Sequence, residues 1–260
     1  MPAAEGFTLI ELLVVVAILA VLMAIMAASL ARVRMAGKSF VCKNQLKNIA
    51  FDFIQFADDY AHPWRGDSDQ DGKSGFHIED FQERQYVIGE FWKVQTQEQA
   101  SQTEGVKLKA SAVPLICPAG PQELRKKPFV SCSQQAIGPL NNVSMGLNMR
   151  LDRVSVQTGP GQPGGLVKVR LSKRILARTT VPLVLDVDGQ AALTRNIDNL
   201  PYYSAPPTNS YDDYANGRYW FPSLRHGGRC NAAFIGGHVL SSARPEREAG
   251  WDWKYQPPRQ

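Results

Sequence analysis

The chain has 260 residues and a mass of 28.8 kDa, with 44% hydrophobic and 20% charged residues. This length and composition exclude a disordered chain and a low-complexity repeat, and they suffice for a buried core in one or two domains. The formal charge is +5 and the pI is near 9.0, a balance that on its own would suit nucleic acid or anionic lipid.

The positive charge is concentrated in one short segment. Residues 52–260 carry a net charge of only +2, which is a weak electrostatic footprint for nucleic acid. Residues 32–51 contain no acid and follow a long apolar run, an arrangement typical of positive charge beside a membrane. The basic residues of this segment are Arg32, Arg34, Lys38, Lys43 and Lys47.

The apolar run covers residues 7–31, FTLIELLVVVAILAVLMAIMAASLA, and its only ionisable side chain is Glu11. As a helix, the part from Leu12 onward spans roughly 30 Å, enough to cross a bilayer once. Two simpler interpretations of this run are a cleaved secretory signal and a plain membrane anchor. Residues 1–6 contain no Lys or Arg, and the run is longer than the ~7–15 residues of a signal sequence, so the sequence predicts a single transmembrane helix.

Glu11 is the informative residue of this run, because a carboxylate at mid-bilayer costs on the order of 2.5–3.5 kcal/mol. It needs a cation, and the helix offers none before Arg32. An α-amino group released by cleavage just before Phe7 would supply one, in the same chain or in a neighbouring chain.

The residues Gly6-Phe7-Thr-Leu-Ile-Glu11-Leu-Leu-Val-Val, followed by the apolar run, resemble the class III signal of type IV pilins and type II secretion pseudopilins. The resemblance implies cleavage between Gly6 and Phe7 by a prepilin peptidase, N-methylation of Phe7, and a role for Glu11 in docking the subunit into a helical filament. It also implies further partners: other copies and related subunits, an inner-membrane assembly platform and inner-membrane lipid. No specific nucleic-acid partner is predicted.

The same resemblance implies a single-pass protein of the bacterial inner membrane with an extracytoplasmic head, in the periplasm or on a surface filament. The positive-inside rule, applied to residues 32–47, points to a cytoplasmic head instead. We follow the resemblance, because the peptidase site must face the cytoplasm and packing in a filament can shield a basic stem.

Beyond Gly37, apolar residues recur at helical spacing, which predicts an amphipathic helix with one stripe on a core. His62-Pro63 should stop it, because the residue before a proline is disfavoured in the helical region. Both halves together predict one helix of some fifty residues. Residues 41–53, VCKNQLKNIAFDF, also resemble a stretch of a bacterial subgroup of pilin-like proteins. The predicted stripe is Leu46, Ile49, Phe53, Phe56 and Tyr60.

The predicted organisation is a leader (1–6), a transmembrane or filament-core helix (7–31), an amphipathic stem helix (32–62) and an α+β head (63–260) with a mainly antiparallel sheet. Residues 78–100 are ambiguous between helix and strand. Segments 159–165 and 200–217 are rich in Gly, Pro and Asn, which predicts loops. The strand candidates are residues 129–132, 166–171, 181–187, 231–235 and 238–242.

Residues 225–239, RHGGRCNAAFIGGHV, predict a β-hairpin with Gly236-Gly237 as a two-residue turn that tolerates positive φ at both positions. They also resemble the subgroup's motif of a His, nine residues and Asp-Gly. His226 matches, but Gly236 replaces the Asp, so that residue's contacts cannot be carried over. His226 and His238 are candidate catalytic or zinc ligands. Without a third ligand at metal spacing, the sequence favours structural histidines.

A D-x-D-x-D-G run predicts a calcium loop, with Asp67, Asp69 and Asp71 as carboxylate ligands and Lys73 contributing its backbone carbonyl. Ile78 stands where an EF-hand has its Glu, so an acid one or two residues later would have to replace it. The resemblance supports calcium, because some pseudopilins hold this ion in their heads. The alternative is a solvated acidic turn.

The four cysteines, Cys42, Cys117, Cys132 and Cys230, allow three pairings if all form disulfides. The spacing favours a disulfide between Cys117 and Cys132, which would close a short proline-rich loop. The alternative is that all four remain thiols. The chain has no C-x-x-C pair, so the sequence does not indicate a zinc ribbon or a thioredoxin-type site.

These patterns favour a structural subunit of a type IV pilus-like or type II secretion pseudopilus filament, and the choice between the two stays open. A membrane-anchored extracytoplasmic binding protein, dependent on calcium or involved in DNA uptake, is the alternative. An enzyme is not expected, because the sequence contains no G-x-S-x-G, H-E-x-x-H, P-loop or G-x-G-x-x-G motif.

Overall fold

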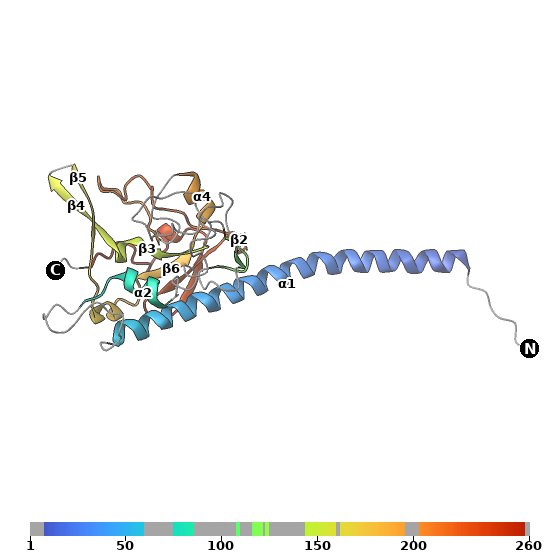
Figure 1. Cartoon of the computed structure of the whole chain (residues 1–260). Helices are drawn as coiled ribbons and strands as arrows, with labels where there is room; N and C mark the ends of the chain where they lie inside the picture. The colour runs from blue at the N-terminus through green and yellow to red at the C-terminus, as the bar shows by residue number, and fades with distance from the viewer. Residues whose placement is uncertain are drawn as a thin grey trace, which may run out of the picture.

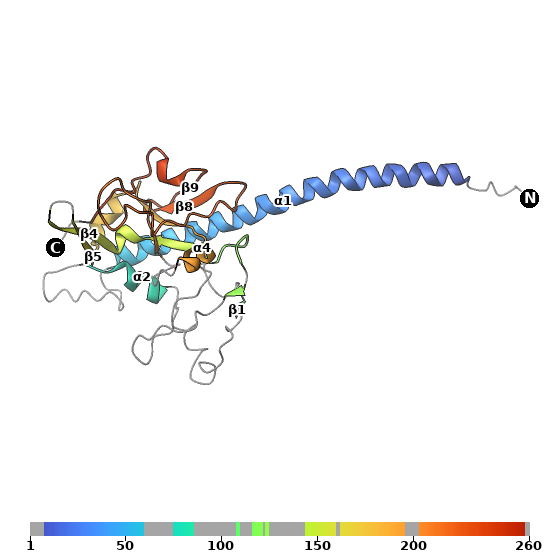
Figure 2. The same ribbon diagram turned by 90° about the horizontal axis from the view of Figure 1, so that it is seen from above.

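The computed structural model describes residues 8–59, 75–85, 108–109, 116–121, 123–124, 144–159, 162–195 and 203–257. Helix α1 (Leu9–Asp58) is a single helix of 50 residues, as the sequence predicted. Its first half projects away from the head and its second half lies along it (Figures 1 and 2). The helix ends before His62-Pro63, which lie outside the described residues.

The two halves of α1 differ in exposure. Large apolar side chains from Leu9 to Val41 are 46–79% exposed, whereas the stripe from Cys42 onward is at most 2% exposed. Cys42 is the first buried side chain along the described part of α1, and Gly37 lies between the two halves. Four members of the predicted stripe are buried, and the fifth, Tyr60, lies outside the described residues. The buried side chains of α1 are Cys42, Leu46, Ile49, Ala50, Phe53, Phe56 and Ala57.

A five-stranded sheet in the order β7-β3-β6-β8-β9 forms the centre of the head. All neighbouring pairs are antiparallel except β3 with β7, which confirms the predicted α+β head. The strands are β3 (Met145–Asn148), β6 (Pro182–Asp186), β7 (Tyr203–Ser204), β8 (Cys230–Phe234) and β9 (Val239–Ser242).

Both faces of the sheet are covered. Side chains alternate along a strand, so Ala233 of β8 joins the core that contains the α1 stripe, while Ala232 and Phe234 point to the opposite face. There Trp251 packs edge-on against Phe234, with ring centroids 5.0 Å apart, and Trp253 completes a second, smaller core. The central strands are therefore buried on both sides, by α1 and by the C-terminal segment.

Helix α2 (Ile78–Gln85) covers the end of the α1 stripe. Phe81 of α2 lies edge-on to Phe53 at 5.2 Å between ring centroids. The ambiguous segment 78–100 thus begins as a helix, and its remainder lies outside the described residues. The remaining elements are β1 (Leu108–Lys109), β2 (Glu123–Leu124), η3 (Met149–Leu151), β4 (Arg153–Gly159), β5 (Gln162–Lys168), η4 (Lys173–Ala177), α4 (Gly189–Thr194) and η5 (Pro245–Arg247).

The loop predicted over residues 159–165 is wrong in part. Strand β5 begins at Gln162, which pairs with Gly159 of β4 across a hairpin with two register shifts. Glycine and proline in this stretch are accommodated by these bulges of a two-stranded ribbon. In the predicted loop 200–217, the described residues from 205 onward form turns and irregular backbone, and only β7 is strand. The strand predicted over 129–132 lies outside the described residues.

The hairpin β8–β9 is confirmed, but its turn differs from the prediction. The amide of Gly237 donates to the carbonyl of Phe234 at 2.8 Å, so Ile235 and Gly236 occupy the centre of the turn. Positive φ occurs at Gly237 (φ 83°) and not at Gly236. A Cβ on Gly236 would lie 2.9 Å from Cβ of Thr179, so the space that a family Asp would need is filled by another side chain.

We expect Phe53→Ala to lower the free energy of unfolding of the head by about 3–5 kcal/mol, because the fully buried ring contacts both α2 and the sheet core. Phe51→Ala is the matched control on the same helix. Its ring is 47% exposed, so the change should stay within about 1 kcal/mol. Denaturant unfolding of the full chain in detergent measures both. Equal losses for the two variants would contradict the burial of this face of α1.

Gly236→Ala should destabilise the head by about 1–3 kcal/mol, because the added methyl group meets Thr179. Gly159→Ala is the control, since a Cβ there has no heavy atom within 4 Å among the described residues. Thermal melting of both variants provides the comparison. A Gly236→Ala chain as stable as the parent would show that the Thr179 segment can move aside.

Candidate functional site

Glu11 lies in the first turn of α1 and closes a capping box with Thr8. The backbone amide and the hydroxyl of Thr8 each donate to Oε2 of Glu11 at 2.8 Å, and the amide of Glu11 lies 3.3 Å from Oγ1 of Thr8. These contacts satisfy donors that the helix start leaves open. The carboxylate therefore has local hydrogen-bond partners in addition to any cation that it meets.

The predicted cleavage residues Gly6 and Phe7 lie outside the described residues. Within the described residues, α1 is the one helix that is long and apolar enough to cross a membrane, by length and composition. The calcium-loop residues Asp67, Asp69, Asp71 and Lys73 also lie outside the described residues, so calcium binding stays a prediction.

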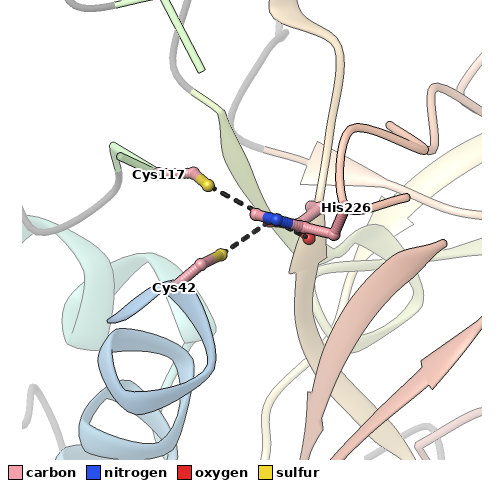
Figure 3. Close-up of side chains that lie close together, drawn as sticks. Cys42, Cys117 and His226 are labelled. Carbon is pink, nitrogen blue, oxygen red and sulfur yellow. Dashed lines mark hydrogen bonds and ion pairs between the residues drawn. The ribbon is translucent and has the colours of Figure 1, made fainter. Parts of the chain in front are cut away.

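A buried group of four potential metal ligands lies between α1 and the sheet. We call Cys42, Cys117, Asp186 and His226 the CCDH cluster; one ligand atom from each lies within 4.8 Å of all the others. Figure 3 shows the side chains of Cys42, Cys117 and His226 pointing toward one another from separate parts of the chain. The sequence pattern marks His226 as a candidate ligand but does not connect it to the other three residues.

Helix and strand periodicity position two members of the cluster. Cys42 lies four residues before Leu46, so it belongs to the buried stripe of α1. Asp186 ends strand β6 two residues after Val184, which places it on the face of the sheet that packs against α1. Asp186 is the only acid in the otherwise apolar stretch VPLVLDV (residues 181–187), and this exception is the sequence signal for a buried carboxylate.

Tight turns position the other two members. The amide of Gly120 donates to the carbonyl of Cys117 at 2.8 Å, which folds the segment 116–121 back over the cysteine. His226 precedes Gly227 and Gly228, whose φ values of 64° and 78° reverse the chain before β8 begins. A residue with a Cβ adopts this left-handed conformation only with strain.

The polar atoms of the cluster converge on a small volume. Sγ of Cys42 donates to Oδ1 of Asp186 at 3.1 Å, and Nε2 of His226 lies 3.3 Å from Oδ2 of Asp186. The same Nε2 lies 3.2 Å from Sγ of Cys117. All four residues are buried, and the side chains of His226 and Asp186 are 2% and 0% exposed.

Backbone amides support two of these ligands. The amide of Ala119 donates to Sγ of Cys117 at 3.4 Å, and the amide of Asn231 donates to Oδ2 of Asp186 at 3.0 Å. Such bonds fix the direction of a sulfur or a carboxylate and stabilise its negative charge.

The pKa values of the two cysteines are shifted in opposite directions. A hydrogen bond with Cys42 lowers the pKa of Cys117 to about 4, and His226 and the Ala119 amide act in the same direction. The interaction with Cys117 raises the pKa of Cys42 above its usual range, as do burial and Asp186. Burial raises the pKa of Asp186 to about 6.

The sequence shows no further ligand at metal spacing from His226, but the fold brings Cys42, Cys117 and Asp186 beside it. His238 is not part of the cluster: it is exposed and stacks on Phe234, with ring centroids 4.5 Å apart. The predicted disulfide partner of Cys117, Cys132, lies outside the described residues. The fourth cysteine, Cys230, is buried on β8, and its thiol donates to the backbone carbonyl of Asp186 at 3.4 Å.

The comparisons with known proteins agree with the N-terminal features. A family model described as the prokaryotic N-terminal methylation motif matches residues 1–27. No curated protein and no solved structure gives a significant match. The chain therefore carries the prokaryotic N-terminal methylation motif, consistent with the signal of type IV pilin-like proteins and pseudopilins.

Proposed function

We propose that this chain is a structural subunit of a type IV pilus-like or type II secretion pseudopilus filament. The observation that carries the proposal is that the methylation motif at residues 1–27 includes the start of an exposed apolar helix that projects from the head. The head would be the part of each subunit that lies on the filament surface.

The exposed half of α1 requires an apolar environment. Each large aliphatic side chain gains about 1.5–3 kcal/mol on leaving water, and residues 9–30 carry a long series of them on every side of the helix. A bilayer supplies this environment before assembly. In a filament, the same surfaces of neighbouring helices would supply it after the subunit has left the membrane.

Glu11 would select the position of the subunit in the filament. Cleavage after Gly6 would place the new α-amino group at Phe7, one residue before the N-cap Thr8. In the apolar surroundings of packed α1 helices, a carboxylate and an α-amino group would attract each other strongly, within one chain or between neighbours. A subunit would therefore be held at the depth where these charges meet.

The partners and location follow from this role. Processing would be by a prepilin peptidase, and assembly would join the chain to other pilin-like subunits at an inner-membrane platform. The head would lie on the extracytoplasmic side. We propose a structural role and not an enzymatic one, since the features that carry the proposal concern anchoring and assembly.

Glu11→Val should reduce filament incorporation at least about 10-fold, because it removes the carboxylate that pairs with the new N-terminus. Glu5→Val is the matched control, since residue 5 belongs to the leader and is absent from the mature chain. Thr8→Ala separates the two roles of Glu11: it breaks the capping box but keeps the carboxylate. The measurement is the share of chain in sedimented filaments, after mass spectrometry has verified a mature start at Phe7. Normal filament yield from Glu11→Val would contradict the mechanism.

A reporter fused after Gln260 tests the position of the head. Alkaline phosphatase, which is active outside the cytoplasm, should be active in this fusion, and a fluorescent reporter that matures only in the cytoplasm should be dark. The reverse pattern would support the positive-inside interpretation of residues 32–47 and would exclude the proposed topology.

A further inference from the structure

The CCDH cluster has the dimensions of a tetrahedral metal site. Zinc binds sulfur at about 2.3 Å and nitrogen or oxygen at about 2.0–2.2 Å, so the ligand atoms around it lie about 3.3–3.8 Å apart. Three contacts within the cluster measure 3.1, 3.2 and 3.3 Å, and none of the ligand atoms lies beyond 4.8 Å from another. Small shifts of side chains would place a single ion at equal reach of all four.

The geometry does not fit a catalytic relay. In a Cys-His-Asp relay, one ring nitrogen faces the nucleophile and the other faces the carboxylate. Here Nε2 of His226 faces both Cys117 and Asp186, and Nδ1 has no hydrogen-bond partner in the described part of the chain. The ligand atoms thus converge on one point and do not form a proton relay.

Burial of the four groups also favours an ion. The side chain of Asp186 is fully buried, and a carboxylate away from water is costly unless a positive charge or a metal compensates it. A divalent cation would do this at the centre of the cluster. Arg225, the residue before His226, donates to the carbonyls of Ser144 and Val187.

The ligand set indicates which ion. Calcium and magnesium prefer oxygen ligands only, whereas two sulfurs, one imidazole nitrogen and one carboxylate oxygen suit zinc. Four protein ligands leave no open position, which is typical of a structural site and not of a catalytic one.

We propose that Cys42, Cys117, Asp186 and His226 bind one structural zinc ion that fastens α1 to the head. The ion joins four separate segments: α1, the turn at 116–121, strand β6 and the loop before β8. Because Cys42 is the first buried side chain along the described part of α1, the ion lies where the helix leaves the head. This inference does not depend on the filament role.

A disulfide between Cys42 and Cys117 is the competing arrangement of the same two sulfurs. It would also join α1 to the turn at 116–121, but it would leave Asp186 and His226 buried without a function in the link. The two arrangements are distinguished by metal content and by mass, since a disulfide removes two hydrogens from the chain.

The test uses the full chain purified in detergent without added metal. We expect about one zinc ion per chain by elemental analysis, and X-ray absorption at the zinc edge should show two sulfur and two nitrogen or oxygen neighbours. This measurement needs no variant. Absence of zinc together with a Cys42–Cys117 disulfide in the peptide map would overturn the proposal, as would a zinc ion with a different ligand set.

Variants then assign the site. Cys42→Ser and His226→Ala should each weaken zinc binding at least ~100-fold, because a direct ligand is lost. Cys230→Ser is the matched control: it removes a buried thiol next to Asp186 that is not a ligand, and it should retain about one zinc per chain.

A chelator should lower the Tm of the parent chain and of Cys230→Ser by about 5 °C or more, and should leave the Tm of Cys42→Ser unchanged. Full zinc content in Cys42→Ser would place the ion elsewhere and reject the site.

Discussion

The packing of the buried α1 stripe against the sheet is the interaction on which the rest of the structure depends. Seven side chains between Cys42 and Ala57 are at most 2% exposed, and they form the centre of the main core. Residues from β3, β6 and β8 contribute the opposing surface, so these strands are buried against a helix that begins outside the head. The head and the stem are therefore one folding unit, although the sequence divides them by composition.

Helical and strand periodicity made the framework predictable. The continuous apolar run and the stripe from Leu46 to Phe56 predicted the length of α1 almost correctly, because the run is long enough for a helix without an interrupting proline and the stripe has helical spacing. The hairpin of β8 and β9 followed from alternation and two glycines. Its turn was misplaced by one residue, since two adjacent glycines do not show which of them lies at the centre of the turn and which adopts positive φ.

The CCDH cluster was not predictable in the same way. Its contacts join residues 144 and 109 positions apart, and no local spacing encodes such pairs. Each member still carried a partial signal: Cys42 continues the helical stripe, and Asp186 interrupts an apolar strand. The sequence does not show that α1 packs against β6, and this packing brings Cys42 and Asp186 together. A search for metal motifs with short spacings does not find a group like the CCDH cluster, because each of its four members comes from a different segment.

Gly37 acquires significance from its position between the two halves of α1. It lies five residues before the first buried side chain, and a Cβ at this position would meet no heavy atom within 4 Å among the described residues beyond its own helix. Glycine also has the lowest helix propensity of the residues in this stretch. Bending the helix thus costs least at Gly37, just outside the core that fixes the head. In the proposed filament, a bend at Gly37 would let the head tilt while the apolar half of α1 keeps its own axis.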